Sequence, residues 1–342
     1  MRSCACVAAC GGMLLWLVVC GSGHSARAAA AASETKADEK WTMLPVEGVA
    51  TARHECGLVS VGGTLYLVGG RGMRPVEALD LEKKNWVELM AAPMEIHHLQ
   101  PVAYQGRVYI VTALTGGYPG ERPLTNVQSF DPATGRWERG RSIPPERRRG
   151  AAGVVVHGEW IYVIGGIRDG HRGGYVAWAD RYNPTTDVWE VLPDAPRPRD
   201  HFAAAVVRDE IVAAGGRTTS QATGKVFDLT VGEVDVFDTV TKQWRTLPEP
   251  IPTPRAGTAA VALGNEVWVI GGESGSQAEA HREVEAVDVQ TGAWRKLPEL
   301  SVGRHGMGAC VIDGVIYVAA GCGQRGGRPE LNSVERIKAA KQ

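Results

Sequence analysis

The chain has 342 residues and an almost even charge balance, with 37 lysines and arginines against 38 aspartates and glutamates. A nucleic-acid-binding surface needs a clear basic excess, so this balance argues against a nucleic-acid partner. With 43 glycines and 19 prolines, the chain is rich in the residues that separate short strands and turns.

Residues 1–32 have the composition of a secretory signal peptide. Arg2 gives a positive start, residues 7–20 are mostly apolar, and the alanine-rich segment 26–32 offers several small-residue cleavage points. We expect cleavage after Ala28, although any bond from 28 to 32 fits, and hence export to the periplasm or the extracellular space. An uncleaved anchor is the less favoured alternative. No later segment approaches ~20 apolar residues, so no membrane span is expected in the mature chain.

The cysteines divide between this leader and the rest of the chain. Four of the seven lie at positions 4, 6, 10 and 20. The remaining Cys56, Cys310 and Cys322 allow at most one disulfide, and no C-x-x-C metal pattern occurs. Lipid attachment at Cys10 or Cys20 stays open, because neither lies in a complete lipoprotein motif.

After a short linker, 33–39, the chain is dominated by internal repeats. An apolar phrase ending in a double glycine, first seen as "LYLVGG", occurs at 65–70, 161–166, 211–216 and 267–272, with weaker copies at 108–113 and 316–321. A second phrase follows each copy, at 76–80, 127–131, 179–183, 234–238, 284–288 and 334–338. Five copies then close with a tryptophan, namely Trp86, Trp137, Trp189, Trp244 and Trp294. The sixth copy has no tryptophan of its own.

Each repeat predicts four short strands. In the first repeat the apolar and β-branched runs are 56–61, 64–69, 76–81 and 85–89, and glycines 62 and 63 form the first hairpin turn. Four strands cannot bury their own faces, so such units stack radially around a channel. The double glycine supplies positive φ angles where backbones crowd, and the tryptophan supplies a packing surface between units.

The ordered set of double glycine, aspartate phrase and tryptophan resembles the kelch repeat, over almost all of the mature length. The resemblance implies an all-β, six-bladed propeller at 40–338, followed by a tail at 339–342. Blade 2 departs from the pattern with Thr112-Ala113 in place of the double glycine, and blade 6 with Ala320-Gly321. The early phrase "KWTML", 40–44, predicts the missing outer strand of blade 6, because a closed ring has to cover its two sheet edges. Trp41 would then replace the tryptophan that blade 6 lacks.

Arginine recurs at one position of the repeat. It lies sixteen positions before the first residue of the double glycine or its equivalent, at Arg53, Arg149, Arg199, Arg255 and Arg304, while blade 2 has Ile96 there. Three further arginines, Arg71, Arg168 and Arg217, follow a double glycine. We expect all eight on one rim of the channel. Two alternatives follow. Either the arginines pair with backbone carbonyls and with repeated acids, which we favour for at least half of them, or they form a cationic funnel that binds an anion. The acids are Glu77, Asp180, Asp235, Glu285 and Glu335. The kelch resemblance implies that arginines at these two places, the repeat position and the residues after the double glycine, bind acidic ligands.

Histidines add an irregular pattern beside the arginines. His54, His97 and His305 follow the arginine position, His98 and His201 lie one residue further, and His171 lies in the blade 3 loop. We expect His305, His54, His97 and His98 to converge. The candidate catalytic residues are His54, Glu55, His97, His201, His305 and Glu273, and the candidate ligand-binding residues include His98 and Asp200 beside the arginines. No metal site is expected, because ligands from separate blades have no local spacing pattern.

Four long loops complete the expected binding face, at 115–126, 167–178, 217–232 and 273–283. They carry Tyr118, Tyr175 and Trp178, and aromatic side chains beside arginines suit sugar or peptide ligands.

We therefore expect a monomeric, cofactor-free binding module for an anionic small molecule or sugar, or for an acidic segment of a protein partner. The alternative is a sugar mutarotase or epimerase similar to the N-acetylneuraminate mutarotases, although the long insertion of that family is missing and no catalytic residue aligns. Galactose oxidases differ in having further domains, and the intracellular kelch adaptors have other domains where this chain has its leader.

Overall fold

The structure is a computed structural model that describes residue 38 and residues 40–339. The expected signal peptide at 1–32, most of the linker, and residues 340–342 of the tail lie outside the described residues.

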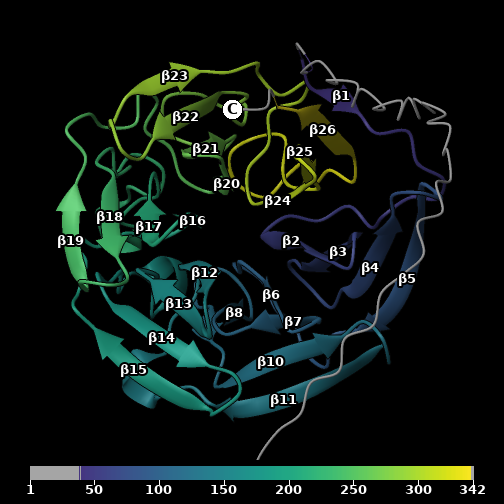
Figure 1. Cartoon of the computed structure of the whole chain (residues 1–342), viewed down its shortest axis with the longest axis horizontal. Coiled ribbons are helices and arrows are strands. Elements are labelled where there is room, and N and C mark those ends of the chain that lie inside the picture. The colour runs from purple at the N-terminus through teal and green to yellow at the C-terminus, as the bar shows by residue number, and fades with distance from the viewer. Residues whose placement is uncertain (1–37, 39, 340–342) are drawn as a thin grey trace, which may run out of the picture. The chain divides into compact units, whose positions relative to one another are not determined.

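Residues 40–339 form a ring of six four-stranded antiparallel sheets (Figure 1), which confirms the predicted all-β, six-bladed propeller. In each sheet one strand lies next to the axis and one at the rim. Blade 1 consists of β2 (Cys56–Val61), β3 (Thr64–Gly69), β4 (Pro75–Asp80) and β5 (Asn85–Ala91). Blade 2 consists of β6 (Val102–Tyr104), β7 (Arg107–Ile110), β10 (Asn126–Asp131) and β11 (Arg136–Ser142). Blade 3 consists of β12 (Gly153–His157), β13 (Trp160–Ile164), β14 (Ala179–Asn183) and β15 (Val188–Leu192).

Blades 4 to 6 repeat this plan. Blade 4 consists of β16 (Ala204–Val207), β17 (Glu210–Ala213), β18 (Asp235–Asp238) and β19 (Gln243–Thr246). Blade 5 consists of β20 (Ala259–Leu263), β21 (Glu266–Ile270), β22 (Val284–Asp288) and β23 (Trp294–Lys296). Blade 6 consists of β24 (Gly308–Ile312), β25 (Val315–Ala319), β26 (Val334–Lys338) and β1 (Thr42–Met43). The loops add a small hairpin of β8 (Leu114–Thr115) and β9 (Arg122–Pro123), and three 3-10 turns, η1 (Pro145–Arg147), η2 (Gly170–Arg172) and η3 (Gln221–Thr223).

Strands from both ends of the described chain close the ring. β1 pairs antiparallel with β26, with Thr42 opposite Arg336, and Figure 1 shows the purple β1 beside the yellow β26. Trp41 is 2% exposed, and its indole Nε1 donates a hydrogen bond of 2.9 Å to the Pro298 carbonyl of blade 5. The predicted closure by Trp41 is therefore confirmed.

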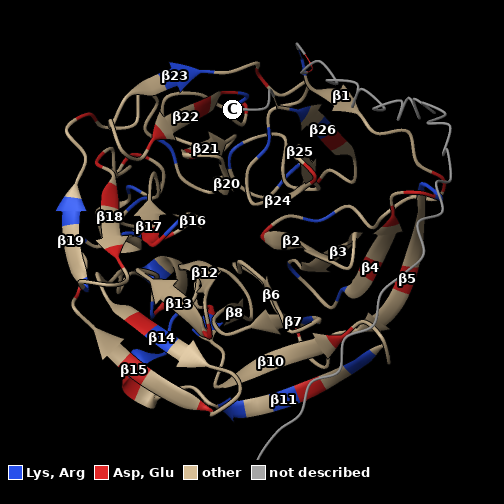
Figure 2. Cartoon of the chain, viewed as in Figure 1, with Lys and Arg blue, Asp and Glu red and all other residues tan. Residues whose placement is uncertain are grey.

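The hydrophobic core lies between neighbouring blades. One cluster joins Val68 of blade 1, Val108 of blade 2 and Val163 of blade 3. The strands next to the axis are largely buried, whereas the outer strands are more exposed, and Figure 2 shows charges of both signs on β11. This gradient follows from radial stacking, because each sheet is covered by its neighbours except at the rim.

The double glycines lie where adjacent blades come closest. The second residue of the pair donates its N–H to the carbonyl at the arginine position of the next blade, as Gly166 does to Arg199 at 2.8 Å. Gly166 has a φ of 108°, and a Cβ there would lie 2.8 Å from the Gly150 carbonyl, so a larger residue would not fit. In blade 2 the Thr112 hydroxyl donates to the Arg149 carbonyl instead, which explains how that blade manages without glycines.

Candidate functional site

Equivalent residues of the six blades form a hydrogen-bonded ring around the axis, which we call the axial ring. Its members stand two positions after the arginine position and are Glu55, His98, Ala151, His201, Gly257 and Gly306. The N–H of each residue from His98 to Gly306 donates to the carbonyl of the preceding member, and the N–H of Cys56 closes the ring onto Gly306, over distances of 2.6–3.2 Å. All six have φ between 52° and 63°.

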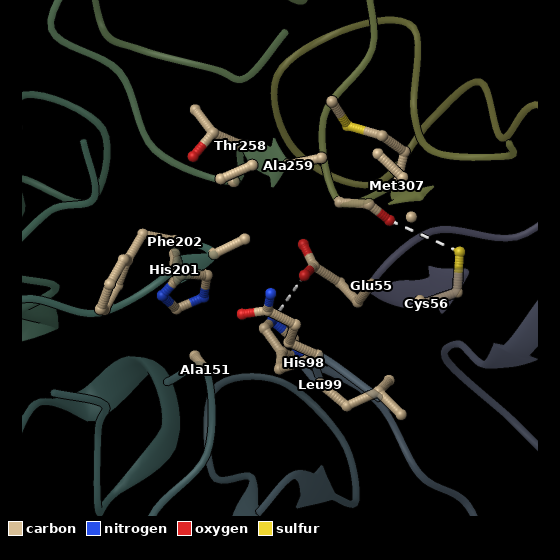
Figure 3. A pocket seen from close by; sticks show the side chains of 18 of the residues that line it. Glu55, Cys56, His98, Leu99, Ala151, His201, Phe202, Thr258, Ala259 and Met307 are labelled. Carbon is tan, nitrogen blue, oxygen red and sulfur yellow. Dashed lines mark hydrogen bonds and ion pairs between the residues drawn. The ribbon is translucent and has the colours of Figure 1, made fainter. Parts of the chain in front are cut away.

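Left-handed backbone favours glycine, which two members of the axial ring are. Glu55, His98 and His201 hold the same conformation with large side chains, at a cost of about 1–3 kcal/mol each. Such strain is found at functional positions. Glu55, His98 and His201 line a small cavity of about 60 Å³ in the channel (Figure 3).

A larger pocket of about 880 Å³ lies beside the axial ring and shares Glu55 with the small cavity. We call it the mouth pocket. Its charged and titratable lining residues are Arg71, Arg74, Arg217, Arg328, His54, His171, His305, Glu55, Glu273 and Glu330. Tyr118, Val226, Phe227 and Pro329 supply apolar walls.

The five arginines of the repeat position do not line this pocket. Each is at most 2% exposed, and each forms an ion pair of 2.5–2.7 Å with the acid expected for its blade. The pairs are Arg53–Glu77, Arg149–Asp180, Arg199–Asp235, Arg255–Glu285 and Arg304–Glu335.

These arginines also explain the sixteen-residue spacing. Arg255 Nε donates to the Gly271 carbonyl, sixteen positions later, at 2.7 Å. Burial lowers the pKa of the Arg255 guanidinium, and the Glu285 carboxylate opposes that shift. Blade 2 lacks both partners, having Ile96 and Gln128 at the two positions, and both side chains are buried. The favoured alternative, in which the arginines pair with carbonyls and acids, describes all five.

The three arginines after the double glycines have different positions. Arg71 and Arg217 line the mouth pocket, paired with Glu121 at 2.7 Å and with Glu273 at 2.6 Å. Arg168 is exposed and stacks over Trp178 outside it, at 5.4 Å. It stands two residues after its glycines, and alternate residues of an extended chain face opposite sides. Buried Ile167 takes the equivalent place in blade 3.

The histidines form two groups rather than the one expected. His54 and His305 lie together, with ring centres 6.3 Å apart. His98 instead groups with His171 and His201, at 5.3 and 4.9 Å. His97 is fully buried behind His98, their Nδ1 atoms 2.6 Å apart.

Two carboxylates flank His305. Its Nε2 lies 3.5 Å from Glu273 and its Nδ1 lies 3.9 Å from Glu55. Burial alone would lower the pKa of His305, but Glu273, Cys322 and Glu55 reverse this and raise it to about 9. Burial would raise the pKa of Glu55, whereas the neighbouring histidines and Arg71 lower it to about 2. An imidazolium between two carboxylates therefore lies at the wall of the mouth pocket.

Sequence reasoning missed Arg74, Arg328 and Glu330 of the mouth pocket. They lie outside the repeated phrases, so no repeat position identified them. Arg328 has no ion-pair partner among residues 38 and 40–339, whereas Arg74 lies 3.3 Å from Glu330. Asp200 is fully buried and accepts from His201 and Thr219. Cys56, Cys310 and Cys322 are free thiols.

Comparison with known proteins agrees with this architecture. The family model described as the Attractin/LZTR1 beta-propeller matches residues 18–280, and the Kelch motif matches residues 303–338. The chain belongs to the kelch-repeat β-propeller family. Kelch propellers typically act as protein-interaction modules.

Individual relatives share the fold at low identity. Kelch-like protein terF of Aspergillus terreus is 28% identical over 308 residues, covering 84% of this chain and 66% of terF. Kelch-like protein 25 of Xenopus tropicalis is 26% identical and covers 75% and 42%. The solved structure of YjhT has a TM-score of 0.71 at 17% identity, over 84% of this chain and 95% of YjhT. The kelch propeller thus spans about two thirds or less of these curated relatives. Among the described residues, no helix is both long and apolar enough to cross a membrane.

Proposed function

We propose that this kelch propeller is a binding module whose mouth pocket takes a carboxylate-bearing ligand, either a small anionic molecule such as an acidic sugar or an acidic segment of a protein. The observation that carries the proposal is the charge of the pocket, where four arginines and the cationic His305 face three glutamates. Guanidinium groups bind carboxylates through paired hydrogen bonds, and a concave site strengthens their field.

The pocket also matches the rest of such a ligand. Glu273, Glu330 and Glu55 can accept hydrogen bonds from sugar hydroxyls or peptide amides, and Phe227 and Tyr118 offer flat apolar surface. Arg328 carries an exposed charge without an ion-pair partner in the described part of the chain, so a ligand anion can supply one. Export, expected from residues 1–32, belongs to the same proposal.

Calorimetric titration of the full chain with N-acetylneuraminate, glucuronate and acidic peptides, beside neutral sugars and neutral peptides, tests the proposal. We expect binding only in the acidic set, weakened about tenfold or more by Arg74→Met or Arg328→Met, because a hydrogen bond to a charged group contributes about 1.5–3 kcal/mol. Arg168→Met, which removes an exposed arginine outside the pocket, is the matched control. Equal affinities for the neutral set, or no loss in either pocket variant, would refute the proposal.

The arrangement of Glu55, His305 and Glu273 favours a second candidate function, the sugar mutarotase or epimerase. The protonated imidazole can donate a proton to a sugar ring oxygen while a neighbouring carboxylate accepts one from the anomeric hydroxyl. Polarimetry of freshly dissolved acidic sugars would detect accelerated mutarotation, which His305→Gln should abolish even at sugar concentrations that saturate the variant. An uncatalysed rate with the wild-type chain would exclude this candidate and leave the binding module standing.

A further inference from the structure

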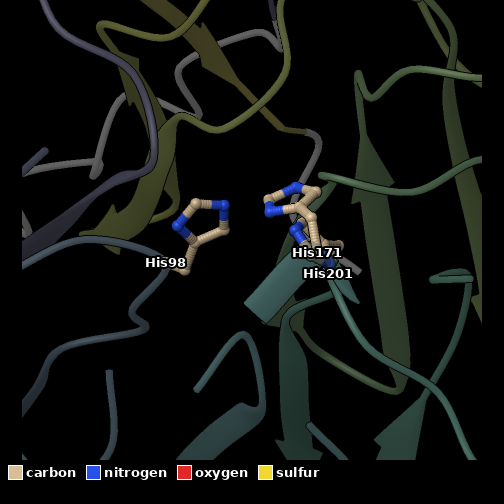
Figure 4. Close-up of side chains that lie close together, drawn as sticks. All are labelled: His98, His171 and His201. Atoms are coloured by element: carbon tan, nitrogen blue, oxygen red, sulfur yellow. The ribbon is translucent and has the colours of Figure 1, made fainter. Parts of the chain in front are cut away.

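Three histidines from separate segments meet beside the axial ring. His98 and His201 belong to that ring, and His171 lies in η2 of the blade 3 loop. Figure 4 shows their rings close together. The ring centres are 4.9–5.3 Å apart, and one ring nitrogen from each lies within 4.8 Å of the other two. All three side chains are buried.

Hydrogen bonds fix which nitrogen each ring presents. His171 Nδ1 donates to Glu121 at 2.9 Å, and His201 Nδ1 donates to Asp200. A carboxylate oxygen accepts each of these bonds, so Nδ1 carries the proton and Nε2 of each neutral ring keeps its lone pair.

The tautomer of His98 follows from a relay through His97. His97 Nε2 lies 2.9 Å from the Gly116 carbonyl and has to donate to it, since a carbonyl only accepts. The Nδ1 of neutral His97 is then an acceptor, so His98 Nδ1, 2.6 Å away, donates. His98 Nε2 also keeps its lone pair.

Two of the three free nitrogens have no hydrogen-bond partner in the described part of the chain. His98 Nε2 and His201 Nε2 are buried and have no hydrogen bond within the described part of the chain. A buried ring nitrogen without a partner is destabilising, because it has lost the hydrogen bond that water would supply. Two of these residues also hold left-handed backbone with φ of 52°, where blades 5 and 6 use glycine. The unpartnered ring nitrogen and the left-handed backbone both occur at His98 and His201, which points to a ligand that the three nitrogens share.

We propose that His98, His171 and His201 bind one divalent transition-metal ion, with zinc the best match, through their Nε2 atoms. Imidazole is a preferred ligand of Zn²⁺, Cu²⁺ and Ni²⁺. Three imidazoles on one tetrahedral zinc, with Zn–N bonds of about 2.0–2.1 Å, place their ring centres about 5 Å apart. The three nitrogens lie within 4.8 Å of one another, so each would have to move by at most about 0.7 Å toward an ion at their centre to reach that bond length.

The surroundings complete the site. Glu121 and Asp200 orient His171 and His201 from behind, as carboxylates do for metal-bound histidines. Three protein ligands leave one position of a tetrahedral zinc open. Glu55 Oε2 lies 3.5 Å from His98 Nε2, beside that position, and His171 lines the mouth pocket. The open position is therefore available to water or to a carboxylate held by the pocket.

Metal uptake tests the site without any organic ligand, so its outcome is independent of the proposed anion binding. The full chain, stripped with a chelator, is titrated with Zn²⁺ alone, and Co²⁺ provides a visible spectrum that reports coordination number. We expect one equivalent per chain and the spectrum of a four-coordinate site. Affinity should fall at least about tenfold in His98→Ala, His171→Ala and His201→Ala, and about 10–100-fold in Glu121→Gln, which loses only the orienting charge.

His281→Ala is the matched control, because His281 is also buried and bonded to a carboxylate through Nδ1, at 3.0 Å from Glu283, but lies outside the triad. Circular dichroism monitors folding. If His98→Ala or His201→Ala fails to fold, His171→Ala decides, since it alters a loop. No saturable uptake by the wild-type chain, or equal uptake by the control and His171→Ala, would overturn the proposal.

Discussion

Replacing Arg255 by methionine separates the structural arginines from the ligand-facing ones. The Arg255 guanidinium is fully buried and donates to Glu285 at 2.5 Å and to the carbonyls of Gly271, Thr253 and Val269 at 2.7–3.0 Å. Removing one partner of a buried ion pair leaves the other charge uncompensated, which costs about 3–5 kcal/mol. We expect Arg255→Met to lower the free energy of unfolding by that amount while acidic ligands keep their affinity.

Urea unfolding of the full chain, followed by tryptophan fluorescence, measures the loss. Arg245→Met is the control, because Arg245 pairs with Glu210 at 2.7 Å but is 44% exposed, and such surface pairs contribute about 0–1 kcal/mol. The double variant Arg255→Met/Glu285→Leu should recover much of the loss, since apolar residues of similar size often replace a buried pair at little cost. A loss below about 1 kcal/mol, or ligand binding weakened as strongly as by Arg74→Met, would refute the reasoning.

Three further predictions concern closure, pH and backbone strain. Trp41→Ala should lower the free energy of unfolding by about 3–5 kcal/mol in urea titrations. Trp86→Ala should lower it by less, because Trp86 is only partly buried and its Nε1 has no partner among the described residues. Equal losses in the two variants would contradict a special role of Trp41 in closing the ring. The folded-state pKa of His305 is raised to about 9, so its contribution to stability is complete below its unfolded value of about 6.5 and is lost as pH rises through 9. The melting-temperature difference between wild type and His305→Gln should accordingly shrink from pH 6 to pH 10. Ala151→Gly should raise the unfolding free energy by about 0.5–1 kcal/mol, because Ala151 has φ of 52° where glycine is unstrained, and a destabilised variant would show that the ring tolerates Ala151 for its packing.

The sequence by itself determined the blades and their closure. The double glycine, the aspartate phrase and the tryptophan recur with the same spacing because each blade is built from the same local contacts. Arg255 is sixteen residues from Gly271 because it bonds to that carbonyl. Trp41 lies near the N-terminus because the ring ends have to pair. Such contacts repeat along the chain, so a repeated pattern reveals them.

The tertiary structure alone decided which side chains meet at the axis. His171 reaches His98 and His201 through η2, and Arg328 reaches the mouth pocket through the loop after β25. Arg168 stands two residues after its double glycine and lies outside the pocket, whereas Arg217 stands one residue after its own and lines the pocket. Loop paths depend on contacts between blades distant in sequence, and these contacts leave no spacing pattern in the chain.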